Sequence, residues 1–351
     1  MKRIIALTLA ILIILSLSAC SKKEDSGLAD KFYNKKDPIQ IVDGAGRKVS
    51  FSKPAMTMAT SWGGVIDSYM FSLEITDRIV GTRSGNNMHK LCMPNLSEIP
   101  AVGRYDLDKE ALAAVAPDVF LHCAAATDIL TEANNVGFRA IGVDTNTLAG
   151  IHDAINLLGT VFGVEDRAKY VVSYYDNILK IVDEHTAKLS KEDKIEVVVL
   201  AHSAGEIASS ENSVLDEMIE RAGGISCAKK NLADENGIYS TSETQVGQEV
   251  IMQWNPKVIF TQECVGEFTA ETVLAMNEWS AMDAVVNGKV YSIPCVSDAW
   301  YTSTPSACLG VLFVSMKLYP ELYADIEFEQ IVTDFYRDIY GLDMTREDLG
   351  F

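Results

Sequence analysis

The sequence predicts an α/β protein whose two lobes are joined by one long helix. Short apolar runs rich in β-branched residues alternate with helical patterns, which is typical of parallel sheets with crossover helices. One apolar 3/4 spacing continues over residues 165–189 without Gly or Pro. At 1.5 Å per residue, a helix of about 25 residues would be roughly 37 Å long, enough to run beside both lobes.

Composition and charge exclude several classes of protein. The 351 residues include 30 Lys+Arg and 49 Asp+Glu, a net charge of −19, with 48% hydrophobic and 23% charged residues. These proportions are those of a folded globular protein, with enough chain for two domains. Because binding to phosphate backbones needs clustered Lys and Arg, the acidic balance excludes a nucleic-acid partner.

Residues 1–19 have the pattern of a secretory signal peptide. Lys2 and Arg3 precede an apolar run at residues 4–15, which is shorter than the roughly 20 residues that a membrane-spanning helix needs. Residues 17–20 resemble a lipobox, in which Cys20 is lipidated and becomes the new N-terminus; a plain signal peptide with a chance Cys is the alternative. The polar residues 20–38 are expected to form a flexible tether. We therefore expect an extracytoplasmic protein anchored to the cell membrane by lipid.

The rest of the chain divides around the long helix. We expect an N-terminal lobe at 39–163, the connecting helix at 164–190 and a C-terminal lobe at 191–351. Strands of the N-terminal lobe are predicted at residues 56–60, 78–80, 118–122 and 139–143. Strands of the C-terminal lobe are predicted at residues 195–201, 257–261 and 289–293. A single rigid connector would limit how far the lobes move relative to each other.

The two halves share a short motif. Glu110 and Glu249 each open a predicted short helix, and six residues separate them from Pro117 and Pro256, which end the helices before an apolar strand. Two such units at the same spacing predict lobes of similar construction with equivalent surface carboxylates. A carboxylate in the first turn also complements the helix dipole, by about 0.3–1 kcal/mol, and this structural role is compatible with a docking role.

Six cysteines remain besides Cys20. Their spacing matches neither a disulfide framework nor a metal-binding clip. Several lie in apolar strand or helix contexts, where Cys acts as a small buried hydrophobe. We expect free thiols, with three disulfides as the alternative, at Cys92, Cys123, Cys227, Cys264, Cys295 and Cys308.

Short motifs occur in a recognisable order from about residue 39 to the C-terminus. They lie at residues 41–51, 77–81, 102–103, 116–118, 222–224, 279 with 284–291, and 309–310 with 318–321. In this order they resemble the lipoprotein substrate-binding components of ABC importers for iron-siderophore, haem and cobalamin-type chelates. The resemblance implies a class III solute-binding fold, with two α/β lobes bridged by one long helix and a ligand in a shallow cleft between them.

The same resemblance implies partners. Such proteins deliver a metal chelate to an ABC permease dimer with its ATPase, and we expect a monomer that is not an enzyme and carries no cofactor. In them a Glu on each lobe contacts Arg residues of the permease, and by motif these fall on Glu110 and Glu249.

Candidate ligand contacts follow the predicted strands, because ligands of open α/β lobes gather beyond the carboxyl ends of parallel strands. Trp62, Trp300 and Tyr301 offer flat faces to a planar chelate, whereas Arg83 and Arg104 offer paired donors to carboxylate or catecholate oxygens. The further candidates after strands are Ser61, His122, His202, Ser203, Gln262, Glu263 and Asp298, whereas Arg104, Tyr105 and Tyr239 are candidates by family position. The set favours a chelate over a bare ion. A ferric siderophore is the predicted ligand, with haem or a corrinoid (cobalamin) as the alternative.

Metal binding and catalysis have less support. The five His residues are scattered, so no protein metal site is expected, although His89 beside Met88 offers an axial ligand to haem iron or corrinoid cobalt if it is not part of an ordinary polar loop. Residues 197–205 resemble the strand and nucleophile elbow of an α/β-hydrolase. No His follows His202, so a triad in the hydrolase order cannot be completed, and no catalytic residue is expected.

Overall fold

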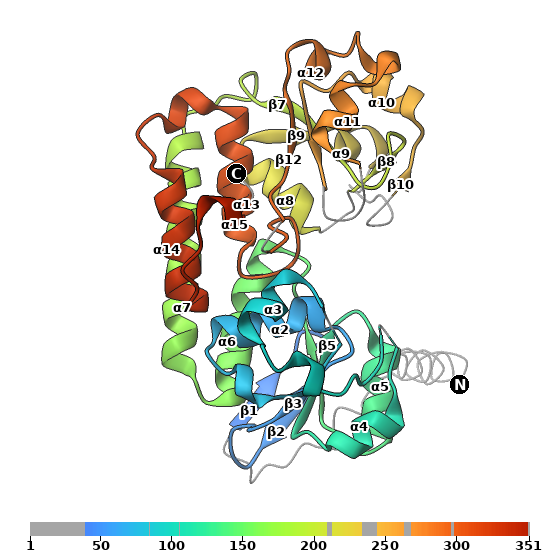
Figure 1. Cartoon of the computed structure of the whole chain (residues 1–351), viewed down its shortest axis with the longest axis vertical. Coiled ribbons are helices and arrows are strands. Elements are labelled where there is room, and N and C mark those ends of the chain that lie inside the picture. The colour runs from blue at the N-terminus through green and yellow to red at the C-terminus, as the bar shows by residue number, and fades with distance from the viewer. Residues whose placement is uncertain are drawn as a thin grey trace, which may run out of the picture.

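The computed structural model describes residues 39–83, 85–104, 106–208, 213–233, 244–262, 268–295 and 298–349. These residues form two α/β lobes, one above the other, with long helices along one flank (Figure 1). The predicted α/β class is confirmed, and each predicted strand is present with bounds that differ by only one or two residues.

The N-terminal lobe is built on a parallel sheet with strand order β4-β3-β5-β6. The strands are β3 (Met58–Ala59), β4 (Ile79–Gly81), β5 (Val119–Cys123) and β6 (Ala140–Val143). The helices and 3₁₀ turns around it are α2 (Gly63–Ser72), η2 (Thr76–Arg78), α3 (Asn87–Cys92), η3 (Leu96–Glu98), α4 (Lys109–Val115), α5 (Thr127–Asn135) and α6 (Leu148–Phe162). Because all strands run in one direction, their carboxyl ends meet at one edge of the sheet.

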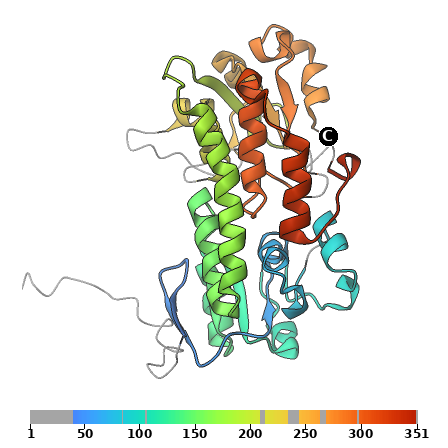
Figure 2. The ribbon, with the colours of Figure 1, turned by 90° about the vertical axis from the view of Figure 1, so that its left-hand side faces the viewer.

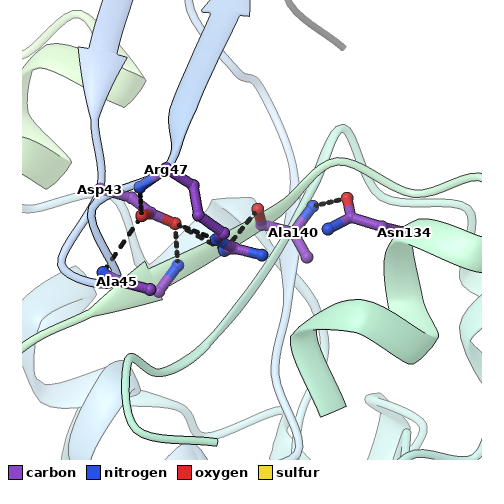
Figure 3. A network of polar contacts seen from close by, with 6 residues as sticks. Asp43, Ala45, Arg47, Asn134 and Ala140 are labelled. Atoms are coloured by element: carbon purple, nitrogen blue, oxygen red, sulfur yellow. Dashed lines mark hydrogen bonds and ion pairs between the residues drawn. The ribbon is translucent and has the colours of Figure 1, made fainter. Parts of the chain in front are cut away.

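A hairpin of β1 (Ile39–Val42) and β2 (Lys48–Phe51) covers the edge of this sheet at β6. The Asp43 carboxylate accepts hydrogen bonds from the backbone N–H of Ala45 (3.1 Å), the Arg47 side chain (3.0 Å) and the backbone N–H of Gly142 in β6 (2.8 Å) (Figure 3). Arg47 also donates to the carbonyl oxygen of Ala140 at 3.1 Å. The turn thus pairs with strand β6, whose backbone groups would otherwise form an open edge.

The C-terminal lobe has a mixed sheet with strand order β10-β8-β7-β11-β12, and β9 also pairs with β7. The parallel strands are β7 (Ile195–Leu200), β9 (Gly224–Ser226), β11 (Val258–Thr261) and β12 (Val290–Ser292). The antiparallel strands are β8 (Glu206–Ile207) and β10 (Thr244–Gln245). The helices and 3₁₀ turns are α8 (Val214–Arg221), α9 (Cys227–Leu232), α10 (Gln248–Trp254), α11 (Ala270–Leu274), η5 (Asn277–Trp279) and α12 (Asp283–Val286).

A layer of long helices joins the lobes. The predicted connecting helix is α7 (Glu165–Thr186), and it lies beside α13 (Ala307–Leu318) and α14 (Phe328–Tyr340), as Figure 2 shows. Two short elements, η6 (Pro320–Tyr323) and α15 (Arg346–Leu349), complete the C-terminal segment.

Polar and apolar contacts fix α7 to both lobes. Arg167 donates to the carbonyl oxygens of Ser72 (2.9 Å) and Ile339 (2.8 Å), which ties the start of α7 to the ends of α2 and α14. One continuous core contains Val119 of the N-terminal sheet and Val258 of the C-terminal sheet. A shared core of this kind opposes large rigid-body movements of the lobes.

The structure corrects the expectation that all six cysteines are free. Cys92, Cys123, Cys227 and Cys308 carry free thiols, but Cys295 is disulfide-bonded. Burial raises the pKa of the Cys92 thiol to about 12, which makes it a poor nucleophile. A disulfide is consistent with the predicted exported state, because disulfides persist outside the reducing cytosol.

Candidate functional site

A cavity of about 690 Å³ lies where the two lobes meet. It is lined from the N-terminal lobe by Ser61, Trp62, Gly63, Gly64, Val65, Arg83, Gly85, Asn86 and Arg104, and from the segment between β12 and α13 by Asp298, Ala299 and Thr302. We call this cavity the cleft. It brings together five of the candidate ligand contacts, among them Trp62, Arg83 and Arg104 from three separate loops; the other two are Ser61 and Asp298.

Trp62 is held by a stack of rings. It directly precedes α2 and is half-buried, and its indole ring stacks on His122 with centroids 5.9 Å apart. His122, at the carboxyl end of β5, stacks in turn on Phe120 at 6.1 Å. Burial lowers the pKa of His122 to about 4, so the imidazole is neutral at physiological pH and acts as an aromatic support. The cleft thus has one rigid aromatic side chain in its wall.

Arg83 and Arg104 are both exposed to solvent. Arg83 follows Thr82, whose backbone N–H donates to the carbonyl oxygen of Pro100 at 3.1 Å. Arg104 follows Gly103, which has a φ of +124° and would place a Cβ 2.0 Å from the Asp106 carbonyl oxygen. Only glycine fits there, so the backbone before Arg104 is fixed. Two guanidinium groups at one cavity favour ligands with anionic oxygens.

A buried polar network supports the loop that carries Arg83. Asp67 of α2 accepts a hydrogen bond from the Thr82 hydroxyl at 2.5 Å, and its Oδ2 lies 2.9 Å from His89 Nε2. The other ring nitrogen, His89 Nδ1, lies 2.5 Å from Oδ1 of Asn86, which also caps α3. His89 is 1% exposed and both of its ring nitrogens have partners, which contradicts the alternative that it ligates haem iron or corrinoid cobalt.

The C-terminal lobe contributes a carboxyl group to the cleft. Asp298 is 5% exposed and accepts a hydrogen bond from the Ser306 hydroxyl. Burial raises the pKa of Asp298 to about 6, although the hydrogen bond from Ser306 opposes the shift. The Tyr69 hydroxyl of α2 donates to the carbonyl oxygen of Ser303 at 2.8 Å, which fixes this segment to the N-terminal lobe. In the sequence, the position of Asp298 after a predicted strand identified it as a candidate ligand contact but assigned it no role.

Trp300 and Tyr301 lie in the core and not in the cleft. Trp300 is 0% exposed, and its indole N–H donates to the Tyr336 hydroxyl at 2.9 Å. Its ring makes edge contacts with Phe313 and Phe328. Tyr301 is 6% exposed. The expectation that they line the cleft is therefore wrong for this structure, because the chain after Asp298 turns toward α13 and α14.

Several other candidates lie elsewhere. Tyr105, Tyr239, Glu263 and Cys20 fall outside the described residues. Asn86, which lines the cleft, was missed because it follows no strand; its only sequence signal is that Asn often caps a helix. In the part of the chain that the structure describes, no group of three or more His, Cys, Asp or Glu side chains is arranged to hold a metal ion. Within that same part, no helix has the length and apolarity to cross a membrane.

The structure also contradicts the hydrolase alternative. His202 and Ser203 lie in the turn between β7 and β8, where the Glu206 N–H donates to the Ser203 carbonyl oxygen. Strand β8 then runs antiparallel to β7. A nucleophile elbow needs a helix directly after its Ser, and here a strand follows.

Comparison with known proteins decides the family. A model of the family described as "Periplasmic binding protein" matches residues 63–296, more than half of the chain. The chain belongs to this family. Its members are substrate-binding proteins of ABC transporters, and solved structures similar to this periplasmic binding protein are class III proteins of that group.

Individual relatives are distant but match over most of their length. The molybdate-binding protein MolA of Haemophilus influenzae is 22% identical over 362 aligned positions, covering 95% of this chain and 96% of MolA. An uncharacterized ABC transporter substrate-binding lipoprotein of Bacillus subtilis, YvrC, is 22% identical and covers 82% of this chain and 88% of its own.

Among solved structures, MolA bound to molybdate has a TM-score of 0.74 and 20% identity, covering 87% of this chain and 99% of MolA. Helicobacter pylori CeuE with Ni(II) bound has a TM-score of 0.73 and 19% identity, covering 89% of this chain and 98% of CeuE. At this level of identity, these structures establish the fold of the periplasmic binding protein and not its ligand.

The internal repeat of the periplasmic binding protein is confirmed as a repeat of structure. Glu110 is the second residue of α4 and Glu249 the second residue of α10, and both are exposed. The residues directly after the two helices, Ala116 and Asn255, have φ values of +45° and +46°, and a Pro and a sheet strand follow each. Figure 1 shows α4 and α10 on the same side of the two lobes, away from α7.

Proposed function

We propose that this periplasmic binding protein binds a metal chelate in the cleft, with a ferric siderophore as the favoured ligand, and delivers it to an ABC permease. The combination of Trp62, Arg83 and Arg104 around one cavity carries this proposal. The aromatic ring supplies a surface for a planar or hydrophobic chelator, and the guanidinium groups supply paired donors for its anionic oxygens. The volume of about 690 Å³ is within the range of roughly 300–1,000 Å³ that is usual for small-molecule sites.

Haem or a corrinoid is the alternative ligand for the same cleft. Either would pack against Trp62, but neither would gain an axial bond from His89, whose ring nitrogens are occupied. Molybdate is a second candidate, because the relative MolA is named for it and the cleft has two arginines. A tetrahedral oxyanion would fill little of the cavity and would not need the aromatic stack, which favours the larger chelate.

Delivery needs contacts with the permease and the membrane. Glu110 and Glu249 are exposed on equivalent helices of the two lobes, and we propose that each binds basic residues of one half of a permease dimer. Two contacts formed at once strengthen each other, because the second forms at high effective concentration. We further propose that a lipid on Cys20 and the tether at 20–38 hold the monomeric receptor near its permease.

The test is titration calorimetry of the purified full-length protein with ferric catecholate, ferric hydroxamate and ferric citrate complexes, haemin, cobalamin and molybdate. Trp62→Ala should weaken binding of the true ligand about 30-fold, because truncation of a buried aromatic anchor costs about 2 kcal/mol or more. The matched control is Tyr170→Ala, an aromatic that is 45% exposed on α7 and outside the cleft lining. Binding of none of the chelates, or unchanged binding by Trp62→Ala, would refute the proposal.

A further inference from the structure

The Ser61 hydroxyl has no hydrogen-bond partner among the described residues, although the residue is 2% exposed. Buried hydroxyl groups are nearly always hydrogen-bonded, so each exception needs an explanation. Ser61 is one of the residues that line the cleft, so its hydroxyl lies within the cleft wall. The missing partner is therefore explained if a ligand atom supplies it.

The N-terminus of α2 begins two residues after Ser61 and faces the same cavity. The helix has ten residues, its N-cap residue Trp62 provides no side-chain cap, and its first turn contains no acidic residue. The N–H groups of Gly63 and Gly64 stand at the start of the helix, where the backbone offers no intrahelical acceptor. Both glycines line the cleft. Such an uncapped helix start carries a partial positive charge and attracts anions.

The first turn of α2 is held in a fixed position. A Cβ on Gly63 would lie 2.2 Å from Thr82 Oγ1 and 2.9 Å from Asp67 Oδ2, so only glycine permits this close approach. Beneath the turn, the Oδ2 atom of Asp67 already has Thr82 and His89 as partners, whereas its Oδ1 atom is buried without one in the part of the chain that the structure describes. Burial raises the pKa of the Asp67 carboxyl group, although its contacts with His89 and Thr82 oppose the shift. Among the described residues, no acceptor is paired with the N–H groups of Gly63 and Gly64.

We propose that the Ser61 hydroxyl and the first N–H groups of α2 form an oxyanion subsite within the cleft. The ligand would present a carboxylate or another oxyanion oxygen to this subsite, and the body of a chelate would pack on Trp62. This inference rests on the proposed function, because it takes the cleft to be the ligand site, and it adds where the negative charge of the ligand is bound. The oxyanion belongs either to a free tetrahedral ion or to a carboxylate arm of a chelate.

The subsite differs from the two arginines in rigidity. Arg83 and Arg104 are exposed and carry flexible side chains, whereas Ser61 is buried and the helix start is packed on Thr82. Fixed donors recognise one position and orientation of an oxyanion, whereas exposed guanidinium groups provide attraction over a wider area. The subsite therefore selects among anionic chelates that the arginines would bind alike.

The test compares Ser61→Ala with the matched control Ser68→Ala in the purified full-length protein. Ser68 lies on α2 and is also buried, but its hydroxyl donates to the Val65 carbonyl oxygen at 2.6 Å. Ser61→Ala should keep or raise the melting temperature, because the lost hydroxyl has no partner in the free protein. It should nevertheless weaken ligand binding about tenfold or more, as expected for one hydrogen bond to a charged group. Ser68→Ala should leave binding unchanged.

The probes are molybdate, phosphate and ferric citrate, each measured by calorimetry. If molybdate or phosphate binds and Ser61→Ala weakens that binding, the oxyanion is a free ion. If ferric citrate is the only probe that binds and whose binding Ser61→Ala weakens, the oxyanion is a carboxylate arm. Equal affinity of Ser61→Ala and wild type for every bound probe, with Trp62→Ala still defective, would overturn the subsite and leave the proposed function intact. If neither Ser61→Ala nor Trp62→Ala changes the affinity for a bound probe, the cleft is not the ligand site. A lowered melting temperature of Ser61→Ala would also overturn the subsite, by showing that the hydroxyl has a structural partner.

Discussion

Replacement of Asp298 by Asn should remove a pH-dependent loss of stability from this protein. Asp298 is 5% exposed at the junction of the lobes, and its carboxyl group loses most of its contact with water. Desolvation penalises the charged form, so burial raises the pKa of Asp298 from 3.8 to about 6. Asn has nearly the same shape and keeps an oxygen that accepts the hydrogen bond from Ser306, but it carries no charge.

The magnitude follows from the two pKa values. The folded protein holds the proton more tightly than the unfolded chain does, so the free energy of unfolding of the wild type falls as pH rises from about 4 to about 6. The difference of about 2.2 pKa units corresponds to about 3 kcal/mol, at about 1.36 kcal/mol per unit. Above about pH 6 the full loss of stability from the charged Asp298 is present, and below about pH 4 it is absent. Asp298→Asn should therefore gain up to about 3 kcal/mol over wild type between pH 4 and pH 7.

The assay is urea unfolding of both proteins at half-unit steps from pH 4 to pH 7.5, followed by tryptophan fluorescence and circular dichroism. The difference between variant and wild type cancels the titration of all other groups. Asp153→Asn, at a side chain that is 83% exposed on α6, controls for the general effect of the substitution. A stability difference that stays constant with pH, or that grows toward acid pH, would refute the assignment of this cost to Asp298.

The same carboxyl group affects binding, because it lines the cleft. Above about pH 6 its negative charge opposes an anionic ligand, and a bound anion would raise its pKa further. The affinity of the wild type for an anionic chelate should therefore rise from pH 7 to pH 5 relative to Asp298→Asn. The variant should bind more tightly than wild type at pH 7, and calorimetry at the two pH values checks this.

Three further predictions follow from other parts of the molecule. Glu110→Ala and Glu249→Ala should each impair uptake in cells without changing ligand affinity, and the double variant should be worse; normal transport by the double variant would exclude the docking role. Cys20→Ala should leave the protein unlipidated, either uncleaved or released, and an unmodified N-terminus in the wild-type mass spectrum would contradict lipidation. Asp43→Ala should lower the free energy of unfolding by about 3–5 kcal/mol, because it leaves the Arg47 guanidinium without its buried partner. A loss below about 1 kcal/mol would show that the hairpin does not depend on this pair.

Much of the fold could be predicted from the sequence because its signals are local. The apolar run at 118–122 is β5, and the 3/4 spacing from residue 165 is α7, which ends at Thr186. The two Glu units, each a Glu in the first helical turn with a Pro after the helix, fold alike because helix start and stop depend on neighbouring residues. Trp62 and Arg83 were found because both follow strands, and parallel strands end at one edge of their sheet.

The same positional rule failed where long-range packing decides the direction of the chain. Trp300 also follows a strand, but its indole N–H donates to the hydroxyl of Tyr336, which is 36 positions away in the sequence. The ring is buried among C-terminal helices. The disulfide at Cys295 likewise depends on which residues meet in space and not on their spacing. Neither outcome has a signal within a few residues of the position concerned.

The properties that define the candidate site come only from tertiary structure. His89 could be taken as a metal ligand until its partner Asp67, 22 positions away, was placed against it. The raised pKa of Asp298 and the unpartnered hydroxyl of Ser61 both result from desolvation, which depends on every element packed around a group. The sequence alone determined the helices and strands and the exposed positions of Glu110 and Glu249, because these follow from local propensity. Burial and hydrogen-bond partners, and with them the chemistry of the cleft, were decided only by the packing of the two lobes.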